Sequence, residues 1–182
     1  MISYGEICKD WLNRSGLRNA DNTDIDMYNC GGYALGTYSW YMPYPENFDR
    51  EDIEDIVVNN YLCGASYNET TERLLEIFER QMLSDFSTLR AIAAECVEDY
   101  IEKDNEELIA FRIFFDIEFY DEDTGEVDFF DYDFHYQVLR NGKWREKCGA
   151  GPIELCEGDY WITKDGVYNY DSEIRYYVRT LK

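Results

Sequence analysis

The stretch LIAFRIFFDIEFY, residues 108–120, marks the point at which the sequence changes character. β-Branched and aromatic residues dominate it, which is typical of a strand. A second run of this kind covers residues 127–140, and a third covers residues 143–149 after the dipeptide Asn141-Gly142. Because Asn-Gly between two strand-like runs favours a two-residue hairpin turn, the second half of the chain predicts an antiparallel sheet.

The first half has the periodicity of helices. Apolar residues recur at helical spacing over residues 49–62 and 70–86, and residues 87–103 continue the pattern after a candidate cap at Ser87. We therefore expect a helical segment over about 50–104.

Helices followed by strands indicate an α+β fold. Three further short strands are expected over residues 159–163, 167–170 and 172–180. The 182 residues suit a single domain spanning 1–182, because only polar turns separate the helical runs.

The charge of the chain narrows the choice of partners. It carries 39 acidic and 17 basic residues, a formal net charge of −22. Such a surface repels nucleic acids and anionic membranes at long range, so we expect neither as a partner, whereas a neutral substrate in a cleft is allowed. The first residues lack the apolar core of a signal peptide, and we expect synthesis in a cytoplasm, with release by another route left open.

The cysteines and the single histidine argue against a structural metal site. None of the six cysteines forms a C-x-x-C pair, and the chain has only one histidine, so we expect no structural zinc site. We therefore expect reduced thiols, no metal and no cofactor.

One cysteine has an unusual context, the stretch YNCGGYALG over residues 28–36. The glycines after Cys30, beginning with Gly31, let the backbone approach a substrate closely, and the apolar run predicts a helix that begins near the cysteine. At a helix N-terminus the pKa of a thiol is expected to fall, which favours the nucleophilic thiolate. The alternative is a buried structural thiol, the interpretation that we give to the other five cysteines.

The only histidine, His135, lies in the middle of the second predicted strand. Alternation along that strand places Asp133, His135 and Gln137 on one face of the sheet. An imidazole near a thiol is the pairing that nucleophilic cysteine catalysis requires, with a third group to orient the ring.

The hairpin register suggests the third group. If Asn141-Gly142 is a two-residue turn, Gln137 pairs with Glu146 and Cys148 lies opposite His135. The Glu146 carboxylate is then a diagonal neighbour of the imidazole.

The motifs NCGGYALG, residues 29–36, and DFHYQVLRNGKWREKCG, residues 133–149, resemble papain-like cysteine hydrolases of the NlpC and CHAP kind. They are most similar to a branch found in phage and bacterial proteins, although the resemblance covers well under half of the chain. It implies a cysteine-bearing helix packed on the antiparallel sheet that carries the histidine. It implies catalytic roles for Cys30 and His135, whereas Glu146 stands where that branch has a second histidine.

The expected activity is cleavage of a peptide or isopeptide amide through a thioester. The resemblance implies a cell-wall peptide or a protein as substrate, and deamidation or transfer on a protein stays open. Candidate oxyanion or substrate-binding residues are Asn29, Gly31, Asp133, Gln137 and Trp144. The alternative is a non-catalytic binding or inhibitory protein on the same fold with an acidic surface.

Overall fold

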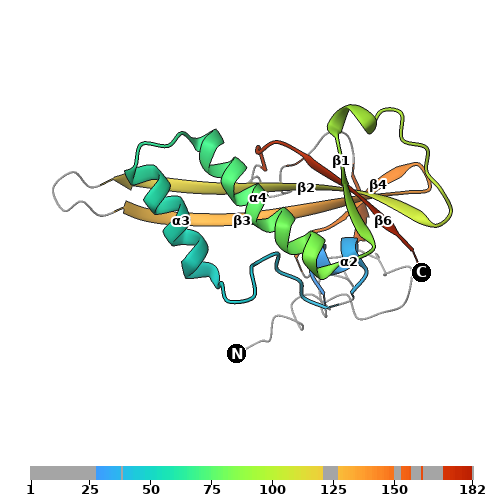
Figure 1. Cartoon of the computed structure of the whole chain (residues 1–182), viewed down its shortest axis with the longest axis horizontal. Helices are drawn as coiled ribbons and strands as arrows, with labels where there is room; N and C mark the ends of the chain where they lie inside the picture. The colour runs from blue at the N-terminus through green and yellow to red at the C-terminus, as the bar shows by residue number, and fades with distance from the viewer. Residues whose placement is uncertain are drawn as a thin grey trace.

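The computed structural model describes residues 28–37, 39–120, 127–149, 153–156, 161 and 170–181 (Figure 1). The described helical elements are α2 (Cys30–Leu35), α3 (Arg50–Leu62), α4 (Tyr67–Asp85) and the 3-10 helix η2 (Ala94–Cys96). The described strands are β1 (Leu89–Ile92), β2 (Glu106–Tyr120), β3 (Val127–Arg140), β4 (Lys143–Lys147), β5 (Ile153–Leu155) and β6 (Arg175–Thr180). They form one sheet of six strands in the order β1-β6-β2-β3-β4-β5, with antiparallel pairs throughout. The predicted α+β class is confirmed.

The long hairpin of β2 and β3 forms the centre of the sheet (Figure 1). Its apolar residues alternate, so that Phe134 and Tyr136 join the main core on the helical side. His135, between them, projects from the opposite face, where Tyr170 and Trp161 pack against it. The sheet therefore has two covered faces in this region, and β3 contributes to both.

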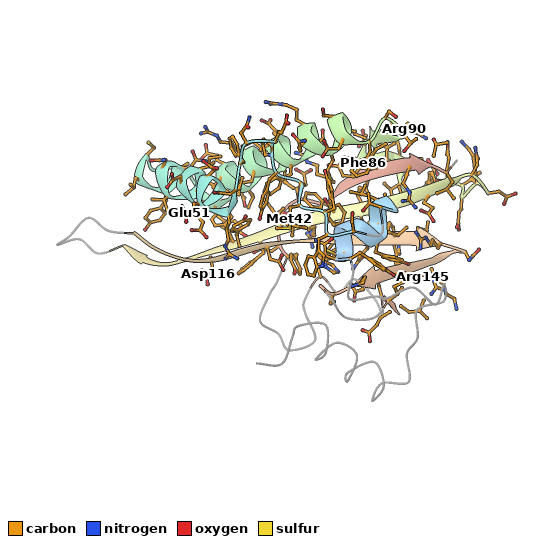
Figure 2. All side chains as sticks on the ribbon, turned by 90° about the horizontal axis from the view of Figure 1, so that it is seen from below. Met42, Glu51, Phe86, Arg90, Asp116 and Arg145 are labelled. Atoms are coloured by element: carbon orange, nitrogen blue, oxygen red, sulfur yellow. The ribbon has the colours of Figure 1, made fainter. Side chains whose placement is uncertain are left out.

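Helix α4 covers one face of the sheet. Ser66 caps its N-terminus in a capping box with Glu69, which satisfies backbone N–H groups that the first turn leaves without partners. The buried side of the helix carries Leu74, Leu75, Phe78 and Met82. Figure 2 shows α3 and α4 lying along the same side of the β2–β3 hairpin.

Helix α2 is short and wholly buried. The Asn29 side chain holds its N-terminus: its oxygen accepts from the N–H of Gly32 at 2.9 Å and of Tyr41 at 3.0 Å, and its amide donates to Tyr41 O at 2.8 Å. Arg140 on β3 lies over the ring of Tyr33, with its guanidinium carbon 4.6 Å from the ring centroid. The helix is therefore fixed both to the following loop and to the hairpin.

The helical prediction for residues 87–103 is wrong. Helix α4 ends at Asp85, and residues Leu89–Ile92 form strand β1, which pairs with β6 at the edge of the sheet. Only a short 3-10 turn, Ala94–Cys96, follows. Pairing with β6 overrides the local helical pattern. An isolated helix of this length is only marginally stable, whereas the ladder supplies hydrogen-bond partners for the backbone of the segment.

The predictions for the strands agree with the structure better than the helical prediction for residues 87–103 does. The strand expected over residues 172–180 is present in its second part as β6, and the β3–β4 register pairs Gln137 with Glu146 as predicted. The strands expected over residues 159–163 and 167–170 lie outside the described residues apart from one position in each. Among the helices that the structure describes, none has the length and apolar character needed to cross a membrane.

The two glycines of α2 predict a graded effect of substitution. A Cβ at Gly32 would lie 1.9 Å from the carbonyl oxygen of Ser39, whereas at Gly31 the nearest atom, Tyr41 O, would be 3.0 Å away. We expect Gly32→Ala to lower the free energy of unfolding by about 1–3 kcal/mol, because backbone must move. Gly31→Ala should cost less, because a 3.0 Å approach needs only a small shift, which the gain in helix propensity of about 1 kcal/mol can offset. Urea unfolding measures both, and equal stabilities would contradict the close docking of α2.

Candidate active site

His135 and Glu146 form a hydrogen-bonded pair across the β3–β4 hairpin. His135 Nε2 lies 3.1 Å from Glu146 Oε2, and Gln137 Nε2 donates to the same oxygen at 3.2 Å. Burial pushes the pKa of Glu146 upward, but the hydrogen bonds from His135 and Gln137 outweigh it and hold the pKa below its usual value. The carboxylate therefore stays charged and is suited to orient and stabilise an imidazolium.

Aromatic rings fix the imidazole from the other side. The His135 side chain is buried and stacks on Tyr170 with 5.2 Å between ring centroids, and Trp161 meets it edge-on at 6.1 Å. The Tyr170 hydroxyl donates to Asp133 Oδ2 at 2.7 Å. Asp133 thus positions the ring that packs on His135, while Glu146 makes the direct bond to the imidazole.

Cys30 is the first residue of α2 and is 5 % exposed. Its thiol donates to Phe134 O, with 3.7 Å between sulfur and oxygen, and the backbone N–H of Tyr136 donates to the sulfur. Burial, followed by the nearby Asp133 carboxylate, raises the pKa of the thiol. The expected lowering of this pKa is not found, and the resting thiol is neutral.

The structure does not join Cys30 to His135. Helix α2 packs with Phe134 and Tyr136, whereas the His135 side chain projects from the opposite face of β3. Among the described residues, Cys30 and His135 share no hydrogen bond. The thiol nevertheless lies against the strand backbone at the two residues that flank His135.

The remaining predicted residues have structural contacts. The Asn29 amide is already bonded to Tyr41 O, so in this state it caps α2 rather than facing a substrate. Gly31 permits the close approach of α2 to Tyr41 and Tyr136. Trp144 pairs with Leu139 across the hairpin and packs against the second, smaller core on the His135 face.

Two cysteines that we interpreted as structural lie beside the His135–Glu146 pair. The sulfur of Cys148 and the ligand atoms of His135 and Glu146 all lie within 4.8 Å of one another, as the hairpin register predicted for Cys148. Burial, followed by the neighbouring Glu146 carboxylate, raises the pKa of the Cys156 thiol. Cys156 follows strand β5, which was not among the strands expected from the sequence, so its position beside Glu146 was not predicted.

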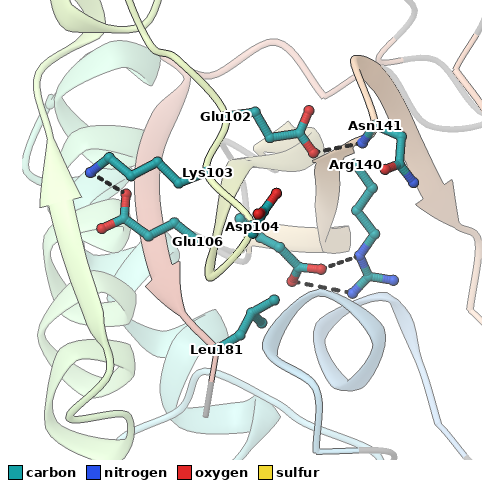
Figure 3. Close-up of a pocket in the computed structure, with 8 residues that line it drawn as sticks. Glu102, Lys103, Asp104, Glu106, Arg140, Asn141 and Leu181 are labelled. Carbon is teal, nitrogen blue, oxygen red and sulfur yellow. Dashed lines mark hydrogen bonds and ion pairs between the residues drawn. The ribbon is translucent and has the colours of Figure 1, made fainter.

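A separate pocket of about 420 Å³ lies where strand β2 begins and strand β3 ends (Figure 3). Its lining residues are Glu102, Lys103, Asp104, Glu106, Glu107, Arg140, Asn141 and Leu181. Glu107 binds both Arg140, at 2.5 Å, and Arg179. Four acidic and two basic side chains thus line the pocket, and it contains none of the predicted site residues.

One of these pocket residues, Glu102, stabilises the β3–β4 turn on which the alignment of the candidate site depends. The Glu102 carboxylate accepts from the N–H groups of Asn141, at 2.6 Å, and Gly142, at 2.8 Å, and so holds the turn that sets the β3–β4 register. That register aligns His135 with Glu146.

We expect Glu102→Ala to destabilise the hairpin by about 1–2 kcal/mol, because two backbone donors lose a charged acceptor. Amide hydrogen exchange at Asn141 and Gly142 should accelerate by roughly tenfold or more. Glu98→Ala removes an exposed carboxylate from the same loop and should leave both amides unchanged. Equal exchange in the two variants would exclude Glu102 as the anchor of the turn.

Comparison of the chain with protein-family models, with curated proteins and with solved structures finds no match in any of the three.

Proposed function

We propose that this protein is a cysteine-dependent amidohydrolase or peptidase. The observation that supports it is the His135–Glu146 pair, in which His135 belongs to the strand whose backbone contacts the Cys30 thiol. Cys30 is the nucleophile, His135 the general base and acid, and Glu146 the residue that orients the imidazole.

The chemical steps follow from these roles. His135 takes the thiol proton as the Cys30 sulfur attacks an amide carbonyl carbon, which forms the C–S bond. The imidazolium then gives that proton to the leaving nitrogen as the C–N bond breaks, and a thioester remains. Water, deprotonated by His135, hydrolyses the thioester and restores the thiol. The pair needs no metal or cofactor for these steps.

The resting geometry places one requirement on this mechanism. The Cys30 thiol is neutral and bonded to Phe134 O, whereas the imidazole projects from the opposite face of β3, so α2 and β3 must rearrange to bring the two together before attack. We therefore assign proton transfer to the moment of attack rather than to a preformed thiolate–imidazolium pair. Catalytic hydrogen bonds are often long or poorly aligned in structures without substrate.

The substrate class rests on charge and on the resemblance of the motifs. A net charge of −22 disfavours nucleic acids, anionic membranes and anionic wall polymers. We propose a peptide or isopeptide amide in a neutral or basic segment, either of a cell-wall peptide or of another protein. We propose that the chain acts where it is made, in a cytoplasm, unless another route delivers it.

A second candidate is a non-catalytic binding or inhibitory protein on the same fold. The 5 % exposure of Cys30 and its bond to the strand backbone favour this alternative, because a purely structural thiol is expected to be buried and protonated. The two candidates differ in one measurable property, which is whether the reactivity of Cys30 depends on His135.

The test is alkylation of the folded chain by iodoacetamide near pH 7, with the rate at Cys30 read by peptide mass spectrometry. We expect His135→Ala to slow labelling of Cys30 by about 10²-fold or more, because a general base contributes about 10²–10⁴. Glu146→Gln should slow it by a smaller factor, since the imidazole keeps its position but loses the carboxylate charge.

Two controls make this result specific. Labelling of exposed Cys63 reports access to reagent and should be equal in all variants, and Glu95→Gln, an exposed carboxylate, should behave as the wild type does. If Cys30 reacts at one rate in the wild type and in His135→Ala, the hydrolase proposal fails and the binding-protein alternative replaces it.

A further inference from the structure

Four potential metal ligands converge on the face of the sheet that carries His135. His135 comes from β3, Glu146 from β4, Cys148 from the residue after β4, and Cys156 from the residue after β5. The ligand atoms of the first three lie within 4.8 Å of one another, and Cys156 lies next to the Glu146 carboxylate. Within the described part of the chain, no other group of three His, Cys, Asp or Glu side chains brings its ligand atoms this close.

We propose that His135, Glu146, Cys148 and Cys156 bind one divalent cation of the zinc type. One imidazole nitrogen, one carboxylate oxygen and two sulfurs are ligands that zinc accepts in tetrahedral sites. With zinc bonds of about 2.0–2.3 Å, the ligand atoms of such a site lie about 3.3–3.8 Å apart. His135 Nε2 and Glu146 Oε2, at 3.1 Å, are already close to that spacing.

Backbone hydrogen bonds hold the strands that carry these four ligands next to one another. Glu146 pairs with Glu154 in the β4–β5 ladder, and the Cys156 N–H donates to Trp144 O at 3.0 Å, so the residue after β5 is held beside β4. Cys148 is exposed and lies outside the ladder, which leaves its side chain room to turn toward the other three ligands.

Binding has a simple proton balance. Both thiols bind as thiolates and release their protons to the solvent, while the imidazole binds as the neutral base. Gln137 keeps its bond to Glu146 and thereby orients the carboxylate ligand. The ligands lie in three different strands or directly after them, so they do not have the C-x-x-C spacing by which many zinc sites are recognised in a sequence.

The site implies a form of regulation, and this consequence rests on the proposed function. A metal on Nε2 of His135 occupies the nitrogen that faces Glu146 and removes the neutral base from the reaction. The metal-bound protein is then a resting form, and removal of the metal restores the His135–Glu146 pair. Metal binding itself does not depend on Cys30.

The test uses Co²⁺ as a spectroscopic substitute for Zn²⁺, added to the full chain in the presence of a phosphine reductant. We expect one equivalent to produce the visible bands of four-coordinate cobalt and the near-ultraviolet absorption of cobalt–thiolate bonds. Cys148→Ser and Cys156→Ser should each lose about half of the thiolate absorption. Cys63→Ser and Cys96→Ser, which alter exposed cysteines elsewhere, should match the wild type.

The outcomes separate this proposal from the hydrolase proposal. Absence of thiolate absorption in the wild type, or its survival in the Cys148→Ser/Cys156→Ser double variant, overturns the metal site. Cys30→Ala should bind Co²⁺ as the wild type does, whatever the fate of the hydrolase proposal. Conversely, one equivalent of Zn²⁺ should slow His135-dependent labelling of Cys30 and a chelator should restore it. If labelling is independent of His135 with and without Zn²⁺, the hydrolase proposal fails and the metal site stands.

Discussion

Backbone pairing between β2 and β3 is the constraint on which both faces of the candidate site depend. The ladder runs from Leu108 opposite Leu139 to Asp116 opposite Asp131 without a shift in register. Over that length neighbouring residues of β3 must project to opposite faces. Phe134 and Tyr136 therefore pack under the helices, and His135 meets the second group of aromatic rings. A shift by one residue would exchange these environments and place an imidazole in the main core.

The hairpin could be predicted because its determinants are local. Asn141 and Gly142 both have positive φ, 53° and 67°, which is the conformation that this dipeptide favours, and the pairing of Gln137 with Glu146 follows by counting. The strand at Leu89–Ile92 could not be predicted in this way, because its partner, β6, lies almost ninety residues later in the chain. Periodicity in the sequence carries no information about such a distant neighbour.

The environment of Cys30 also depends on distant residues. The context of the cysteine predicts a helix that begins there, and α2 does begin at Cys30. The pKa of its thiol depends instead on burial and on Asp133, which alternation along β3 had placed on the face of His135. Cys156 illustrates the same limit, since its position beside Glu146 comes from the β4–β5 pairing and not from any spacing of cysteines.

The place of β6 in the sheet has a consequence for biosynthesis. Residues 175–180 fill the gap between β1 and β2, which are themselves distant from β6 along the chain. The guanidinium of Arg179 also occupies the space beside Gly36, where a Cβ would lie 2.1 Å from its terminal nitrogen, so β6 contacts the end of α2. Because a ribosome releases the chain from its N-terminal end, the segment that carries Cys30 emerges long before the strand that completes its surroundings. During translation the end of α2 therefore lacks its final packing partner until β6 has been synthesised and has paired with β1 and β2.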